Sequence, residues 1–170
     1  AQRARPALCW RGRFIDAHAT WYDRFQPPAV PLSKDALALA DAQTPTLVDG
    51  TGRALVPQFA GYTLYAQGAP TFLFTAGGRE FTDRLQPTSD GRGLARRITV
   101  AGRGGPLALV VAAADDITES KPGHYQIDKR WSVDVAQAHA ERFRSASGRL
   151  TIAIPAGDQP LTIDMECRWP

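Results

Sequence analysis

The sequence predicts an all-β protein, a two-sheet antiparallel β-sandwich with one or two short helices. Three observations predict this fold. Residues 59–87 contain three consecutive strand patterns, residues 161–169 alternate between apolar and polar side chains, and 15 glycines and 13 prolines break the 170-residue chain into short segments. Roughly ten to twelve short strands separated by turns are typical of two packed sheets.

The three strand patterns in residues 59–87 form the clearest element. The runs 59–65, 70–74 and 79–85 are rich in aromatic and β-branched residues. Glycine-containing connections at 67–70 and 76–78 separate them. Strand-forming runs joined by short Gly turns predict a three-stranded antiparallel meander.

Other strands are predicted from the same kind of pattern. Residues 46–49 and 53–56 flank Gly-Thr-Gly and predict a hairpin. Residues 107–114 are apolar at both odd and even positions, so both faces of the strand are apolar. This pattern predicts a central strand covered on both faces. Alternation at residues 161–169 places Cys167 on the buried face. Further strands are predicted at 8–15, 94–100, 124–128, 131–135 and 150–154.

Two segments have the composition of short helices. Residues 32–42 are the first, with Ser33 placed to cap the helix, although their leucines alternate strictly. Residues 136–143, AQAHAERF, precede a Ser-Ala-Ser-Gly break. No repeat or linker divides the chain, so residues 1–170 are predicted to form one domain.

Composition excludes several classes of partner. The net charge is +3, but acidic and basic residues are interspersed and no block of five like charges occurs, so nucleic-acid binding is not predicted. No apolar run is long enough to span a membrane.

Two cysteines, Cys9 and Cys167, lie near the ends of the chain, without a CxxC motif or a Cys/His cluster. This spacing favours a disulfide that joins the first strand to the last. The sequence also begins at Ala1 rather than Met, as a chain does after signal-peptide cleavage. Both features predict a periplasmic or extracellular protein, because disulfides persist in oxidising compartments.

No pattern in the sequence assigns a catalytic residue, a metal or a cofactor. A GxSxG motif is absent, and His18, His124 and His139 are widely separated. Carboxylates that could serve a glycosidase or bind calcium occur at Asp115, Asp116 and Glu119, and at Asp16 and Asp23. Acidic loop residues more often stabilise turns, and this role is favoured for them.

The strongest binding candidate is the aromatic segment 18–25. Trp21, Tyr22 and Phe25 offer flat apolar faces to a sugar ring or a protein side chain, while Arg24 and Asp23 offer directional hydrogen bonds. Arg11 is a further candidate binding residue. The alternative is that Trp21 and Phe25 cover one end of the sandwich core.

Several motifs resemble those of a known family. They are the run WRGRFID at 10–16, Trp21 followed by Arg24, FAGY at 59–62 with GAPTF at 68–72, and GRGLAR at 91–96. The chain resembles a β domain of large secreted bacterial proteins, of the planctomycete type, that combine a sugar-dehydrogenase-like propeller with c-type cytochrome modules. The resemblance implies a non-catalytic companion of redox modules, yet this chain has neither a CxxCH motif nor propeller repeats.

Two functions are therefore compared with the structure. The first is a non-catalytic accessory protein that docks on protein subunits of a larger assembly, a redox or electron-transfer complex; an exposed apolar patch would favour it. The alternative is a carbohydrate-binding or carbohydrate-active sandwich; a cleft lined by aromatic residues and carboxylates would favour it.

Overall fold

The computed structural model describes residues 4–10, 18, 22, 36–39, 43–65 and 68–169. The chain divides into two compact units, one of residues 1–5 with 43–170 and one of residues 6–42. In the smaller unit, the described residues include β1 (Leu8–Cys9) and β2 (Leu37–Ala38), which pair antiparallel. The larger unit holds every other element described below.

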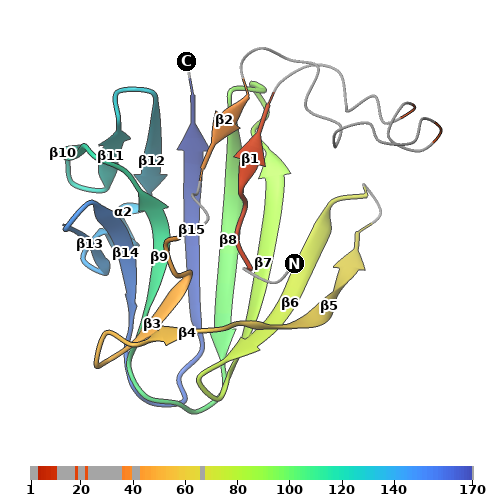
Figure 1. Cartoon of the computed structure of the whole chain (residues 1–170), viewed down its shortest axis with the longest axis vertical. Helices are drawn as coiled ribbons and strands as arrows, with labels where there is room; N and C mark the ends of the chain where they lie inside the picture. Colours follow the sequence, from red (N-terminus) through yellow and green to blue (C-terminus); the bar gives the residue numbers. More distant parts are fainter. Residues whose placement is uncertain are drawn as a thin grey trace. The chain divides into compact units, whose positions relative to one another are not determined.

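Two antiparallel sheets make up the larger unit (Figure 1). The eight-stranded sheet has, in spatial order, β10 (Ile117–Lys121), β11 (His124–Ile127), β12 (Trp131–Val135), β15 (Leu161–Arg168), β8 (Gly93–Ala101), β7 (Arg79–Pro87), β6 (Pro70–Ala76) and β5 (Gln58–Leu64). The five-stranded sheet has, in order, β13 (Phe143–Ala146), β14 (Arg149–Ile154), β9 (Leu107–Ala113), β3 (Leu47–Asp49) and β4 (Ala54–Leu55). A single turn of helix, α2 (Gln137–Ala140), connects β12 to β13.

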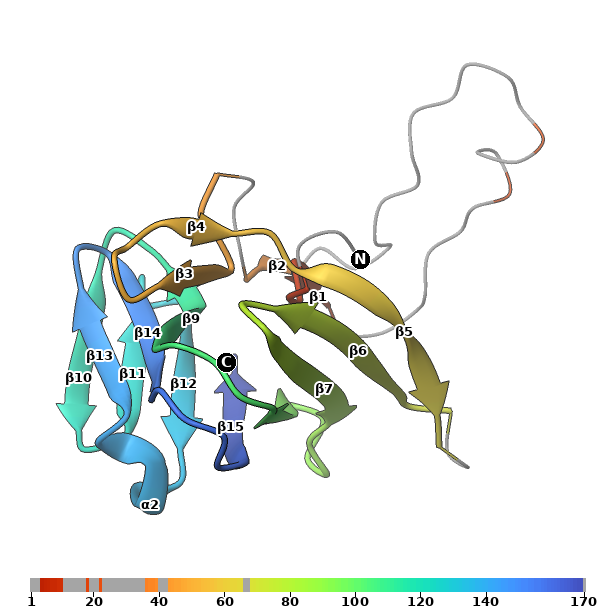
Figure 2. The same cartoon turned by 90° about the horizontal axis from the view of Figure 1, so that it is seen from below.

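The two sheets pack face to face through apolar side chains. Figure 2 shows β13, β14 and β9 stacked over β10, β11 and β12. Tyr125 of β11 and Phe143 of β13 are in contact across the sheets, with ring centroids 6.0 Å apart. Fully buried side chains from both sheets fill the interior, among them Ile98, Leu109, Ile127, Leu150, Ile152 and Ile163. The predicted all-β sandwich is thereby confirmed.

The meander of β5, β6 and β7 has the predicted order and direction. Gly77 and Gly78 connect β6 to β7 with φ values of +58° and +79°. Two successive positive φ values are what a tight hairpin turn requires, and glycine adopts them without steric cost. Phe74 and Phe81 pair across the two strands and stack with centroids 4.9 Å apart.

Strand β9 is the central strand of its sheet, as its apolar sequence predicts. It pairs with β14 on one side and β3 on the other. The register with β14 shifts between Leu150 and Thr151, so an extra residue of β9 is accommodated there. The extra residue shifts which side chains point inward: odd-numbered residues face the core on one side of the bulge and even-numbered residues on the other. Strand β9 therefore needs apolar side chains at both odd and even positions.

The two predicted helices differ from the structure. Residues 37 and 38, inside the first predicted helix, form strand β2; Leu37 and Leu39 are buried while Ala38 is exposed. The strict alternation of leucines thus has the period of a strand rather than of a helix. The second helix is only α2, because Phe143 already belongs to β13. The predicted strand 8–15 is described only in part: β1 ends at Cys9, and residues 11–15 lie outside the described residues.

Candidate functional site

The aromatic segment predicted for binding lies mostly outside the described residues. Trp21, Arg24, Phe25 and Arg11 are not among them. Tyr22 is described, is 77% exposed, and has its ring centroid 4.7 Å from that of His18. The binding role of this segment therefore stays a prediction.

The two cysteines are both buried. Cys9 belongs to β1 and Cys167 to β15. Within the described part of the chain no disulfide between them is seen, so the bridge stays a prediction as well.

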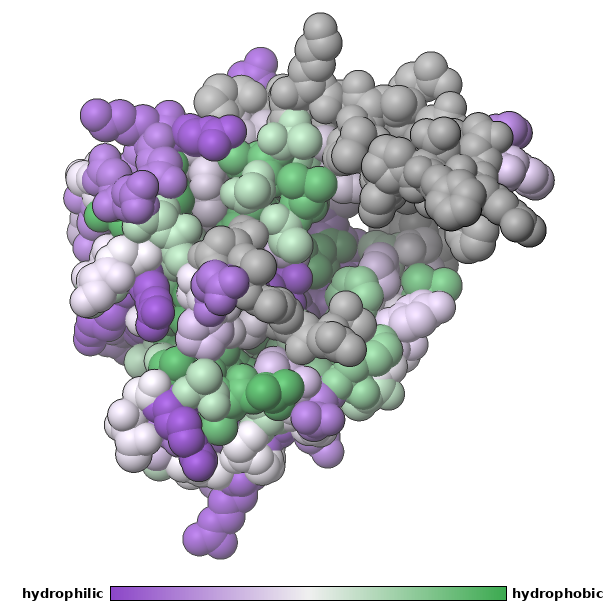
Figure 3. Space-filling view, viewed as in Figure 1, coloured by the Kyte–Doolittle hydropathy of each residue, from purple (hydrophilic) through white to green (hydrophobic). Residues whose placement is uncertain are grey.

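Exposed apolar side chains gather on β5 and β6. Phe59, Tyr62, Leu64 and Phe72 are 46%, 58%, 63% and 36% exposed. They share one face of the sheet, because Phe59 pairs with Phe74, Tyr62 with Phe72 and Leu64 with Pro70. We call these four residues the β5–β6 apolar face. Figure 3 shows a mixture of green and pale lavender residues on the side of the molecule where β5 and β6 lie, and mostly hydrophilic residues, in purple, on the side of β10 and β11.

The two edges of the eight-stranded sheet differ in chemistry. The edge strand β10, ITESK, has Glu119 and Lys121 and a register shift between them. Charges and bulges of this kind prevent another strand from pairing with an edge. The opposite edge strand β5, QFAGYTL, has a bulge near Gly61 but no charged residue, and six of its seven residues are exposed. Among the described residues, no strand pairs with the outer side of β5.

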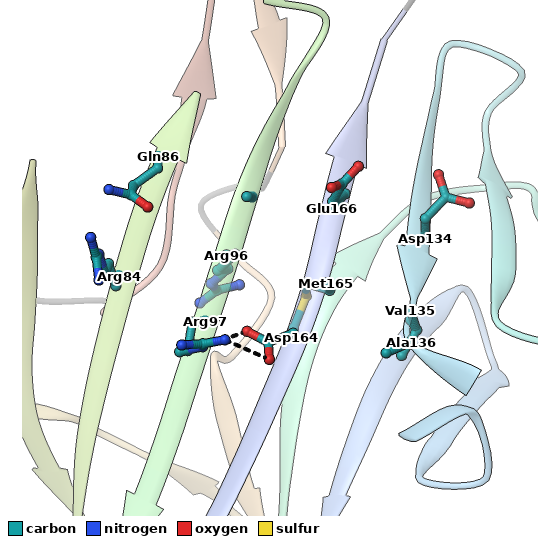
Figure 4. A pocket seen from close by; sticks show the side chains of 11 residues that line it. Arg84, Gln86, Arg96, Arg97, Asp134, Val135, Ala136, Asp164, Met165 and Glu166 are labelled. Carbon is teal, nitrogen blue, oxygen red and sulfur yellow. Dashed lines mark hydrogen bonds and ion pairs between the residues drawn. The ribbon is translucent and has the colours of Figure 1, made fainter. Parts of the chain in front are cut away.

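A second feature is a hollow of about 510 Å³ on the polar face of the eight-stranded sheet, away from the five-stranded sheet. It extends across β7, β8, β15 and β12 (Figure 4). Its floor includes Ala95 of β8, which pairs with Gln86 of β7 on one side and Glu166 of β15 on the other. The lining side chains of the polar face are Arg84, Gln86, Ala95, Arg97, Asp134, Asp164 and Glu166.

Several charged groups of the hollow are already paired. Arg97 donates from Nε and Nη2 to the two oxygens of Asp164, at 2.6 and 3.0 Å, and these hydrogen bonds raise the pKa of Arg97. Glu166 accepts from Arg168 through Oε2 alone, at 2.9 Å from Nε. Asp134 Oδ1 lies 2.5 Å from His124 Nδ1. Glu166 and Asp134 thus each retain one carboxylate oxygen outside these pairs.

Arg84 is the charged group of the hollow that lacks a counterion among the described residues. Its guanidinium carbon lies 4.3 Å from the centroid of the Tyr65 ring, and its Nε is buried without a hydrogen-bond partner. Gln86, two residues along the same face of β7, also makes no side-chain hydrogen bond within the described part of the chain.

The carboxylates considered for catalysis or calcium form local contacts. Asp116 accepts from the Thr118 hydroxyl at 3.0 Å, and Glu119 accepts from the Gly123 amide at 3.1 Å. These contacts are turn-stabilising roles of the kind that the sequence favoured. Asp16 and Asp23 lie outside the described residues. Where the structure describes the chain, no group of three His, Cys, Asp or Glu side chains is arranged to hold a metal ion.

Comparisons with known proteins give no further information: no family model, curated protein or solved structure matches the chain. Within the described ranges, no helix has the length and apolar character needed to cross a membrane.

The sequence did not predict that the residues lining the hollow lie together. The polar side of β15, with Thr162, Asp164, Glu166 and Arg168, was visible in the alternation of residues 161–169. What the sequence did not reveal was that β7, β8 and β12 lie beside it.

Proposed function

We propose that this protein is a non-catalytic accessory protein that docks on a partner protein through the edge strand β5. One observation carries the proposal: among the described residues β5 is an uncharged edge strand, and three of its own side chains and one of β6 form an exposed apolar face. Apolar faces of this kind on soluble proteins mark interaction sites, and an unprotected edge can accept a further strand.

The partner we propose is an extended, uncharged segment of another protein that adds antiparallel to β5. Main-chain hydrogen bonds would supply part of the affinity, and alternate apolar side chains of the segment would cover Phe59, Tyr62 and Phe72. Neither β5 nor β6 has a charged residue, so a charged segment would gain no counterion there and would lose hydration. The opposite edge, with Glu119 and Lys121, lacks these properties.

The proposed cellular compartment and the proposed redox complex are inferred from the sequence alone. The resemblance to companion domains of cytochrome-bearing proteins supports a partner in a redox or electron-transfer complex. The two cysteines support a periplasmic or extracellular location. We propose no cofactor for the protein itself.

The test compares binding by the parent protein with binding by Tyr62→Lys and Leu64→Lys. Both side chains are more than half exposed, so the fold is expected to persist. Partners captured from the native source are identified, purified and titrated against each variant. Each lysine is expected to weaken binding at least tenfold, because it places a charge against an apolar segment. The control is Thr118→Lys, an exposed residue on the opposite edge.

Two results would overturn the proposal. The first is a purified partner that binds both β5 variants as tightly as the parent. The second is a parent protein that self-associates through β5, with Tyr62→Lys returning it to a monomer in sedimentation experiments. The apolar face would then be an interface between copies of this chain.

A carbohydrate-binding function is the second candidate. The hollow on the polar face favours it, because the hollow presents arginine, amide and carboxylate groups together. Its lining residues include no aromatic side chain, and for this reason docking remains the first proposal.

A further inference from the structure

The hollow has the size of a small-ligand site and a floor shaped by one small residue. Ala95 is flanked in register by the longer side chains of Gln86 and Glu166. A methyl group between longer neighbours leaves a depression in the sheet surface. Its volume of about 510 Å³ lies within the range of small-molecule pockets, about 300–1,000 Å³.

The β7 end of the hollow offers a positive charge and hydrogen-bond donors. Arg84 has no ion pair among the described residues, and its buried Nε has no hydrogen-bond partner. A buried donor without a partner costs free energy, and a planar guanidinium is best matched by a carboxylate that accepts two parallel hydrogen bonds. Figure 4 shows Arg84 and Gln86 side by side on β7.

The opposite end of the hollow offers hydrogen-bond acceptors. Glu166 and Asp134 use one carboxylate oxygen each in their pairs with Arg168 and His124. Carboxylate oxygens accept hydrogen bonds from hydroxyl groups. Strands β7 and β15 are two strand spacings apart, roughly 10 Å, so a ligand of about the size of a sugar can reach from Arg84 to Glu166. Asp134, on β12, lies one strand farther from β7.

We propose that the hollow binds a carboxylate-bearing sugar of the uronic acid class. The ligand carboxylate pairs with Arg84, and a ring hydroxyl donates to the carboxylate oxygen of Glu166 that Arg168 does not occupy. A neutral sugar would leave Arg84 without a counterion. A polyanion would place negative charge against Asp134, Asp164 and Glu166. This site is separate from the docking strand β5.

The experiment is a calorimetric titration of the parent protein with glucuronate and galacturonate, and with glucose and galactose as neutral counterparts. At least one uronate is expected to bind, with its neutral counterpart at least tenfold weaker. Arg84→Gln is expected to weaken uronate binding at least tenfold. Arg130→Gln, which changes an exposed arginine in the turn between β11 and β12, is the matched control and should bind like the parent.

Ala95→Leu provides a second test that leaves all charges in place. Its larger side chain fills the floor of the hollow, so uronate binding should be lost while thermal unfolding shows an intact fold. The inference is overturned if neither uronate binds the folded parent, if glucose binds as tightly as glucuronate, or if folded Ala95→Leu binds like the parent. Tyr62→Lys should retain uronate binding, so failure of docking and failure of this inference are distinguishable.

Discussion

Arg96 of β8 and Asp83 of β7 form a bidentate ion pair, joined by two hydrogen bonds, inside the protein. Arg96 donates from Nε to Oδ1 at 2.9 Å and from Nη2 to Oδ2 at 2.7 Å, and the two side chains are 2% and 3% exposed. Burial is the largest single effect and opposes the charged form of Arg96, but the charge and the hydrogen bonds of Asp83 together outweigh it and the pKa of Arg96 is raised. Each charge is therefore tolerated only because the other is present.

Asp83→Ala is expected to destabilise the fold by about 3–5 kcal/mol, because it leaves the Arg96 guanidinium buried without a counterion. Chemical denaturation of the two proteins measures the difference. The matched control is Asp164→Ala, which removes the partner of Arg97 from a similar bidentate ion pair. The side chains of Arg97 and Asp164 are 59% and 45% exposed. An exposed pair contributes about 0–1 kcal/mol, so similar losses in the two variants would show that burial does not decide the cost.

Trp131→Ala tests the orientation of β12. Trp131 is 5% exposed, whereas Asp134 on the other face belongs to the polar hollow. Removal of a buried indole is expected to cost about 3–5 kcal/mol. Asp134→Ala should cost about 0.5 kcal/mol, since its contact with His124 is partly exposed to solvent. Denaturant titrations that gave equal losses would contradict the orientation seen in the structure.

Local patterns predicted the strands well where one face of a strand is buried. Three of these patterns involve only residues close in sequence. They are the apolar and polar alternation in β15, the apolar residues on both faces of β9, and the glycine turns of the meander. The order of strands depends on distant pairings instead. Strand β15 lies between β12 and β8, and no local signal reveals those neighbours.

The candidate sites were harder to predict for the same reason. The hollow combines residues between Arg84 and Glu166 that become neighbours only through sheet register. The pair of Arg96 and Asp83 was also missed, because charged residues in strands are normally expected to face solvent. By contrast, the strand at 59–65 was predicted from its local pattern, but that pattern does not reveal that β5 is an edge strand of the described sheet.

The proposed disulfide between Cys9 and Cys167 can be measured directly. Closing a loop of nearly the whole chain should stabilise the fold by about 4–5 kcal/mol in the chain-entropy model. Alkylation of the protein in denaturant without reductant, followed by intact mass measurement, should show no modified cysteine. Two alkylated thiols would rule the bridge out, and an unchanged stability after reduction would contradict its expected contribution.

Tyr125 should make the protein less stable at high pH. Burial raises the pKa of Tyr125 to about 12, with a further contribution from nearby Glu119, while a tyrosine in the unfolded chain has a pKa near its ordinary value of 10.0. Between these two values the folded state retains a proton that the unfolded state has lost. The stabilisation is therefore fully present below pH 10 and decreases as the pH rises toward 12. Denaturation midpoints measured at pH 9 and 11.5 should fall more in the parent than in Tyr125→Phe, whose ring has no ionisable hydroxyl. An equal fall in both proteins would assign the alkaline instability to other groups.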